Sequence, residues 1–268
     1  MLDFRSFVYG FLRKAIPFTA RYWNRLEIRG LNNIATPGSK LLAVNHGGGW
    51  DYDNFTIMSA LDYVTTSNPA RKHIWLYAWD KWCDSTSGFE GAWSDIYRKF
   101  SAIPIHIEKK GKPPIPWQMV ANIVKKGELM VICPEGHSAA LYEGYRLWRF
   151  YPGVIKIHLR YKVPILPTAM IGFVQSVPML ANRYNPDAVP PWEDERMLPF
   201  PIPFPWHKLI IHIGEPLSFP EYFGKEISKA KQFELANIVK EKVRGLISQY
   251  RSGVDKDHPM GFKIKSLK

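Results

Sequence analysis

The sequence predicts an α/β domain with a largely parallel sheet flanked by helices, preceded by an N-terminal amphipathic helix. Three observations indicate this fold class. Strand-like and helix-like segments alternate along the chain, which is typical of α/β domains. Residues 129–133 are apolar throughout, as in strands buried on both faces of a parallel sheet. The length of 268 residues is sufficient to bury one large hydrophobic core.

The hydrophobic patterns place the individual elements in order along the chain. Strands are expected at 41–44, 73–78, 103–107, 129–133, 164–173 and 208–213, and helices at 54–63, 117–126, 154–161 and 228–250. Gly127 should end the second of these helices. Eight of the 22 prolines fall within residues 176–206, which predicts an extended loop because proline cannot donate to a sheet ladder.

The N-terminal segment 3–20 has the pattern of an amphipathic helix. Its apolar residues recur at helical spacing, and cations lie among them: Phe4, Phe7, Val8, Phe11 and Ala15, with Arg5, Arg13 and Lys14. Such a helix can lie in a membrane interface or pack against the core of its own domain, and the pattern favours neither. We therefore divide the chain into this segment at 1–24, a folded domain at 25–252 and a basic tail at 253–268 that we expect to be flexible.

Composition narrows the classes of partner. A formal charge of +12 favours an anionic partner, but no basic tract or motif typical of nucleic-acid binding occurs, so we expect no nucleic-acid partner. Cys83 and Cys133 are the only cysteines, which excludes a disulfide framework and a cysteine-based zinc site. No apolar run reaches about 18 residues. If the substrate is a lipid, we expect a peripheral or monotopic protein, at the anionic cytoplasmic face of a membrane.

The segment from Asn45 to Asp51, which contains three consecutive glycines, carries the clearest chemical signal. It follows a predicted strand and precedes a predicted helix, and the glycines favour a loop that can fold Asp51 back onto His46. Paired in this way, Asp51 would fix the imidazole tautomer while the other ring nitrogen takes a proton from a substrate hydroxyl. A structural histidine, an aspartate that only caps its helix and a simple glycine turn are the alternatives.

A second segment, from Cys133 to Ser138, follows the predicted strand 129–133. The carboxyl ends of parallel strands form the crevice in which α/β sheets bind ligands. There Gly136 would allow a close approach of the backbone, and Glu135 could hold a hydroxyl or orient a cation. Pro-Glu-Gly is also an ordinary turn sequence.

Together and in this order, these segments resemble the glycerolipid acyltransferase superfamily, which includes the 1-acylglycerol-3-phosphate and lysophospholipid acyltransferases. The resemblance spans roughly residues 25–250 and rests on five short motifs in the family's order. These are Asn45-His46 with Asp51, Ala102-Ile103-Pro104-Ile105, Pro134-Glu135-Gly136, Gly153 with Val163-Pro164-Ile165-Leu166-Pro167, and Ile213-Gly214-Glu215-Pro216-Leu217.

The resemblance implies an O-acyltransferase of the glycerolipid acyltransferase fold, without cofactor or metal. It would move a fatty acyl group from acyl-CoA or acyl carrier protein to a hydroxyl of a (lyso)glycerolipid or related lipid, with His46 and Asp51 as its catalytic pair. Two arginines that the family uses to bind the acceptor's phosphate have no counterpart in this sequence. The residues expected to bind substrate, including possible substitutes for those arginines, are Asn45, Lys109, Glu135, Gly136, His137, Arg146 and Arg149.

Three other functions stay open at this point. A thioesterase or lipid hydrolase would use the same pair with water as acceptor. A non-catalytic lipid-binding protein would keep only the fold. A metalloenzyme would recruit His46, Asp51 and His137. For the acceptor, lysophosphatidate is the best single named candidate, and a bulkier lipid occupying the space near His137 and Ser138 is the alternative.

Overall fold

A computed structural model describes residues 4–66, 73–80, 83, 88–106, 114–136, 138, 139, 141–183, 196–199 and 203–251. Its described strands form a seven-stranded sheet in the order β1-β9-β6-β2-β5-β3-β4 and a separate two-stranded sheet of β7 and β8. Their bounds are β1 Glu27–Arg29, β2 Lys40–Val44, β3 Ile74–Trp79, β4 Ala102–Ile105, β5 Leu129–Ile132, β6 Ile165–Ile171, β7 Met179–Arg183, β8 Arg196–Pro199 and β9 Ile210–Ile213.

The pairing within the large sheet is parallel except between β6 and β9. The carboxyl ends of β6, β2, β5, β3 and β4 therefore lie along one edge. β2 lies between β6 and β5, and every residue of β2 is buried, as expected for a central parallel strand. The fold class read from the sequence, a largely parallel sheet flanked by helices, is confirmed.

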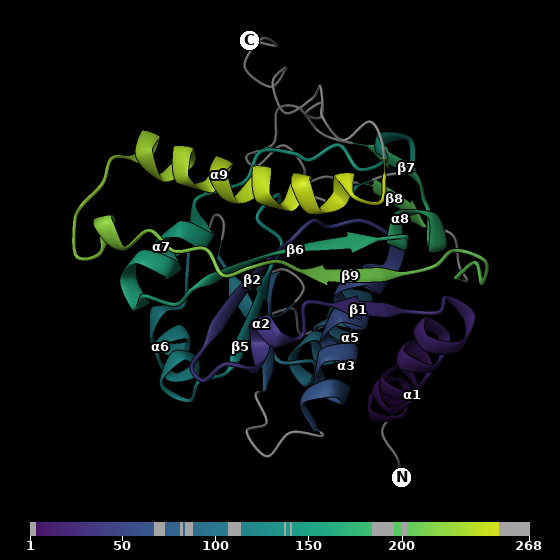
Figure 1. Ribbon diagram of the computed structural model, residues 1–268. Helices are drawn as coiled ribbons and strands as arrows, with labels where there is room; N and C mark the ends of the chain where they lie inside the picture. The colour runs from purple at the N-terminus through teal and green to yellow at the C-terminus, as the bar shows by residue number, and fades with distance from the viewer. Residues whose placement is uncertain are drawn as a thin grey trace.

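Helices cover both faces of this sheet (Figure 1). Their bounds are α1 Phe4–Phe18, α2 Asn32–Ala35, α3 Tyr52–Thr66, α5 Gly88–Lys99, α6 Trp117–Lys125, α7 Gly153–Tyr161, α8 Phe173–Ser176 and α9 Lys229–Ser248. Alternate residues of β2 separate the two halves of the core. Leu42 and Val44 pack with residues of α1, α3 and α5, whereas Leu41 and Ala43 pack with residues of α6, α7 and α9.

Local signals explain where several helices begin and end. The Ser228 hydroxyl accepts a hydrogen bond from the Lys231 backbone N–H and caps α9. Gly127 follows α6 with φ +72°, a conformation that glycine adopts at little cost. α7 ends at Tyr161, and the residue after it, Lys162, is left-handed, with φ +56°.

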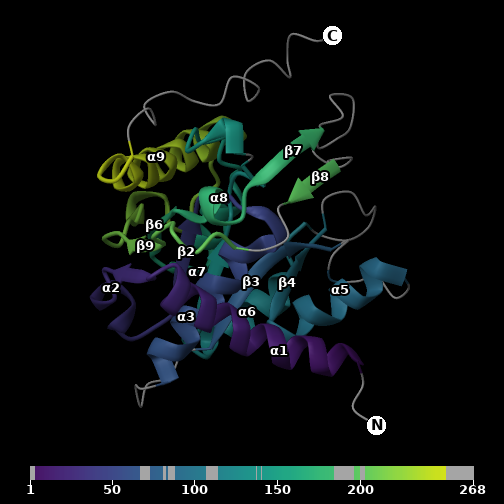
Figure 2. The ribbon, with the colours of Figure 1, turned by 90° about the vertical axis from the view of Figure 1, so that its right-hand side faces the viewer.

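Several segments differ from the sequence prediction, among them the helices α2, α5 and α8, which were not predicted. Within 176–206, expected to be an extended loop, β7 and β8 form an antiparallel pair, at upper right in Figure 2. Pro178 precedes β7 and Pro199 ends β8, so neither interrupts the middle of a strand. The short strand β1 also escaped prediction, because its three residues pair with β9, about 180 residues later.

The N-terminal segment forms α1 and a π-helical turn at Thr19–Trp23. Ile16 and Ala20 are buried in the core, and α1 runs beside α3 and α5 (Figure 2). Phe11, Phe18 and Tyr22 are exposed. The side chains of Phe4, Arg5, Phe7, Val8 and Arg13 lie outside the described part of the structure, as does the tail 253–268.

Candidate functional site

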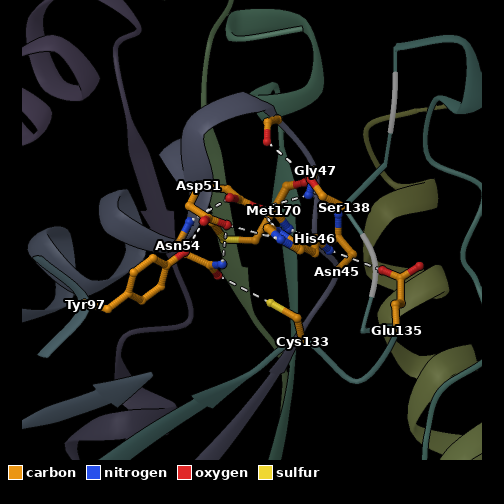
Figure 3. A network of polar contacts seen from close by, with 12 residues as sticks. Asn45, His46, Gly47, Asp51, Asn54, Tyr97, Cys133, Glu135, Ser138 and Met170 are labelled. Carbon is orange, nitrogen blue, oxygen red and sulfur yellow. Dashed lines mark hydrogen bonds and ion pairs between the residues drawn. The ribbon is translucent and has the colours of Figure 1, made fainter. Parts of the chain in front are cut away.

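The candidate site is centred on His46, two residues after the carboxyl end of β2 (Figure 3). Asn45 anchors this position from the preceding residue. Its amide nitrogen donates to the Met170 carbonyl over 3.0 Å, and its amide oxygen accepts the Met170 N–H over 2.7 Å. Asn45 thus extends the pairing of β2 with β6 through its side chain. We predicted from the sequence that Asn45 binds substrate; in the structure both of its side-chain functional groups bond to the β6 backbone, and the residue is only 4% exposed.

The glycines after His46 allow the loop to pass close to α8. A Cβ atom at Gly47 would lie 2.4 Å from the Val174 side chain, and Gly48 has φ +113° beside the Phe173 carbonyl. The Gly49 N–H donates to the Val177 carbonyl over 2.6 Å. Larger residues at the first two positions would displace the loop, because neither the space nor the backbone angle suits a side chain.

The His46 imidazole lies between two carboxylates. Its Nδ1 is 2.6 Å from an Asp53 oxygen, and its Nε2 is 3.4 Å from an Asp51 oxygen. The predicted proximity of Asp51 is present, but the closer carboxylate belongs to Asp53. Asp53 also accepts the Gly47 N–H over 2.8 Å and is almost fully buried. From the sequence we predicted Asp51 as the partner of His46 and did not consider Asp53, although this second aspartate lies only two positions later.

Asp51 is held by residues of two helices. The Tyr97 hydroxyl on α5 donates to one of its oxygens, and the Asn54 amide donates to the other over 3.3 Å. Its backbone has φ +51°, a left-handed conformation that aspartate tolerates better than most residues. Burial would raise the pKa of Asp51, but its contacts with His46, Tyr97 and Asn54 outweigh that effect and lower it.

The charge on His46 is set by opposing effects. Burial disfavours the imidazolium, but the negative charge of Asp53 and the hydrogen bonds to both carboxylates hold the pKa of His46 well above its ordinary value. The nearby Cys133 thiol donates to the Asn54 amide oxygen over 3.3 Å, and burial raises its pKa to about 12. Cys133 is therefore a neutral thiol in this site rather than a nucleophile.

Glu135 contacts the His46 loop on the side away from Asp51 (Figure 3). One carboxylate oxygen accepts the His46 backbone N–H over 3.2 Å and the other accepts the Trp148 N–H over 2.7 Å. Burial raises the pKa of Glu135 to about 8. We predicted from the sequence that Glu135 binds substrate; in the structure it is 2% exposed, and both of its oxygens accept backbone N–H groups, one of them in the His46 loop.

The other expected substrate-binding residues are dispersed. Gly136 is exposed in the turn after β5, with φ +64°. Arg146 and Arg149 are also exposed, and the Arg149 guanidinium lies 3.9 Å from the centre of the Phe233 ring on α9. Ser138 is buried, and its hydroxyl donates to the Gly48 carbonyl over 3.3 Å. Lys109 and His137 lie outside the described residues.

The potential metal ligands among the described residues are His46, Asp51 and Asp53, whose ligand atoms lie within 4.8 Å of one another. The alternative predicted from the sequence was a metal held by His46, Asp51 and His137, and His137 lies outside the described residues. The ion that imidazole and carboxylate ligands suit would be a divalent cation. In the structure His46 already contacts both carboxylates, and a histidine paired with a carboxylate can also act as a general base.

His46 and the two carboxylates thus lie at the carboxyl end of a central strand, where α/β sheets commonly bind ligands. Residues 25–171, more than half of the chain, match the model of the Acyltransferase family. The chain belongs to this family.

The chain is also similar to proteins of mycobacteria and, in fold, to a solved structure. Uncharacterized proteins of Mycobacterium tuberculosis and Mycobacterium bovis are each 25% identical over 257 residues, covering 90% of this chain and 66% of theirs. A Mycobacterium leprae protein is 23% identical. The chain thus spans just under two thirds of these relatives. The crystal structure of PlsC, the 1-acyl-sn-glycerophosphate acyltransferase of Thermotoga maritima, has the same fold, with a TM-score of 0.54, 16% identity and coverage of 94% of this chain and 86% of that one.

Proposed function

We propose that this protein transfers a fatty acyl group from acyl-CoA or acyl carrier protein to a hydroxyl of a (lyso)glycerolipid or related lipid. The observation that supports this most directly is the His46 imidazole, held between carboxylates within the segment that matches the acyltransferase model. His46 has 13% side-chain exposure, so it is sheltered from bulk water while still accessible from one side.

In the proposed reaction, Nε2 of neutral His46 takes the proton of the acceptor hydroxyl as the hydroxyl oxygen attacks the thioester carbonyl carbon. A tetrahedral intermediate forms and collapses, the carbon–sulfur bond breaks, and the leaving thiolate takes the proton back from Nε2. The products are the acylated lipid and the free thiol. A positioned general base of this kind typically contributes about a hundredfold to ten-thousandfold in rate.

For the acceptor, lysophosphatidate is the named candidate that we propose to test first. Arg149 could meet a lipid phosphate only by leaving the Phe233 ring, over which it now lies. A guanidinium that gives up a cation–π contact loses about 0.5–1 kcal/mol at an exposed site, a small cost beside a bidentate phosphate contact. A bulkier acceptor that does not use Arg149 is the competing outcome.

A face of the N-terminal segment supports the proposal that the protein works on an anionic membrane. Phe11, Phe18 and Tyr22 are 61%, 55% and 62% exposed. Phe11 and Phe18 are seven residues apart in α1, which places them on one side of the helix, and the ring centres of Phe18 and Tyr22 lie 4.9 Å apart. Trp23 and Trp206 are exposed nearby, where the Arg25 guanidinium donates to the Trp206 carbonyl. We call these five residues, Phe11, Phe18, Tyr22, Trp23 and Trp206, the aromatic row.

Cations accompany the aromatic row. The Arg21 guanidinium lies 5.5 Å from the centre of the Tyr22 ring, and Lys14 and Arg25 are exposed. Exposed aromatic side chains with adjacent cations suit the interface of an anionic bilayer. No helix among the described residues combines the length and apolar character needed to cross a membrane.

The proposed function is tested by incubating the protein with labelled acyl-CoA or acyl carrier protein and a total lipid extract, followed by mass spectrometry of the products. We expect a labelled acyl ester that is absent from His46→Ala. Free fatty acid formed at the same rate without lipid would indicate a hydrolase. Loss of transfer in chelator would indicate a metal at His46, Asp51 and Asp53.

A further inference from the structure

The two carboxylates beside His46 occupy different sides of its ring. Asp53 faces Nδ1 over 2.6 Å, and Asp51 faces Nε2 over 3.4 Å. A histidine that acts as a general base uses one nitrogen to accept a proton and needs a fixed N–H on the other. The two carboxylates therefore cannot have the same role.

The Asp53 carboxylate is a hydrogen-bond acceptor that is held in place by backbone N–H groups. It lies in the first turn of α3, where a helix favours negative charge, and its side chain is 1% exposed. One oxygen accepts the Gly47 N–H over 2.8 Å as well as facing Nδ1, and the other accepts the Asn54 N–H over 2.8 Å. These backbone contacts tie Asp53 to the loop and the helix together, so its position relative to the imidazole is determined by both.

Asp51 differs in exposure and in support. Its side chain is 24% exposed, and its partners other than His46 are the Tyr97 hydroxyl and the Asn54 amide. It lies beside Nε2, the nitrogen left to take the proton if Asp53 holds the Nδ1–H. An acceptor hydroxyl that reaches Nε2 must therefore approach within contact distance of the Asp51 carboxylate.

We infer that Asp53, seven residues after His46, is the positioning residue that fixes the imidazole tautomer, and that Asp51 lies on the acceptor side of the ring. The catalytic roles in this inference rest on the proposed function, whereas the assignment of the His46 tautomer is independent of it. Asp53 accepts the Nδ1–H throughout, and Nε2 alone exchanges a proton with the acceptor hydroxyl and the leaving thiolate.

The first experiment measures the tautomer directly in the full-length wild-type protein. Nitrogen-15 NMR of labelled histidine, with His46 assigned by its absence from His46→Gln, reports which ring nitrogen carries the proton at a pH above the titration of His46. We expect the proton on Nδ1. A proton on Nε2 would overturn the inference, whether or not the protein transfers acyl groups.

The second experiment compares Asp53→Asn and Asp51→Asn for transfer rate and for the His46 titration. We expect Asp53→Asn to lower kcat by about 10³–10⁴-fold, by analogy with the effect of the wrong tautomer in a triad, and to lower the pKa of His46. Asp51→Asn should lower kcat by about tenfold or less, raise KM and leave the proton on Nδ1. Asp95→Asn, which removes a surface ion pair with Arg98 on α5, is the matched control and should change neither.

The inference is overturned if Asp51→Asn moves the proton to Nε2, or if Asp53→Asn retains more than a tenth of wild-type kcat. Should Asp53→Asn fail to fold, the wild-type tautomer and the Asp51→Asn spectrum decide the question. A wild-type protein with the Nδ1 proton and no acyl transfer would refute the proposed function while leaving the assignment of Asp53 intact.

Discussion

Replacing Glu135 with alanine tests whether the His46 loop is held from behind by this buried carboxylate. The change leaves two backbone N–H groups, those of His46 and Trp148, without the acceptors that lie 3.2 and 2.7 Å away. A buried donor left unpaired costs about 1–3 kcal/mol. We therefore expect a loss of about 2–6 kcal/mol in the free energy of unfolding, which is large against the 5–15 kcal/mol that is usual for a folded protein.

The assay is denaturant unfolding of Glu135→Ala at neutral pH, with transfer activity measured on the folded fraction. Glu234→Ala on α9 is the control, because Glu234 is exposed and pairs with Lys231 on the same helix, a contact worth at most about 1 kcal/mol. Activity should fall with the loss of Glu135, since His46 would no longer be fixed. Unfolding of Glu135→Ala within about 0.5 kcal/mol of wild type, with normal turnover, would refute the positioning role.

The pH dependence of the same comparison gives a second readout. Burial raises the pKa of Glu135 from 4.5 to about 8 in the folded protein, so between these values the folded state binds a proton that the unfolded state has lost. The stabilising contribution of Glu135 is thus complete below about pH 4.5 and declines as the pH rises through about 8. The stability difference between wild type and Glu135→Ala should therefore be greatest in acid and narrow toward pH 8.

Further predictions concern the base, its titration, the membrane and the acceptor. His46→Ala should lower transfer about a hundredfold to ten-thousandfold without unfolding the protein; near-normal turnover in a folded sample would contradict the mechanism. Because the carboxylates raise the pKa of His46 and only the neutral ring accepts a proton, kcat/KM should increase with pH until it passes that raised pKa; a flat profile would argue against His46 as the base. Phe18→Ser with Tyr22→Ser should weaken co-sedimentation with anionic liposomes, measured at rising salt to screen the electrostatic part, and leave the melting temperature within about 2 °C; unchanged binding would exclude the aromatic row. With competing acceptors in one reaction, dominant phosphatidate formation that is lost in Arg149→Ala would identify Arg149 as the phosphate contact, whereas its retention would assign that contact elsewhere.

Much of the sheet could be predicted from sequence because burial on both faces leaves an unmistakable pattern. Residues 41–44 of β2 and all four residues of β5 are apolar, and the predicted helices carry apolar residues at helical spacing. β1 could not be found in this way, since three residues have no periodicity and the partner strand is distant in sequence. The pair β7 and β8 was hidden by prolines, which mark the ends of these strands rather than their absence.

Which residue pairs with His46 was beyond the sequence for a different reason. Three glycines leave the backbone free to place either Asp51 or Asp53 beside the ring, and composition cannot choose between them. The choice is made by tertiary contacts: Val174 and Phe173 lie against the glycines, and the Gly47 N–H is directed at Asp53. The burial of Glu135 could not be predicted either, because it depends on the path of the chain at Trp148, 13 residues later.

Tyr52, the residue between the two carboxylates, connects the active-site loop to the proposed membrane face. Its hydroxyl donates to the Asn24 side chain over 3.1 Å and lies 3.2 Å from the Thr19 hydroxyl. Thr19 and Asn24 flank Tyr22 and Trp23 in the chain, and the Asn24 amide also donates to the Phe204 and His207 carbonyls, on either side of Trp206. The hydrogen bonds of Tyr52 therefore connect the aromatic row to the segment that carries Asp51 and Asp53, the two carboxylates beside His46. If the aromatic row enters a bilayer, this connection fixes the position of the His46 loop relative to the lipid surface, so an acceptor lipid would reach a base whose place is already set.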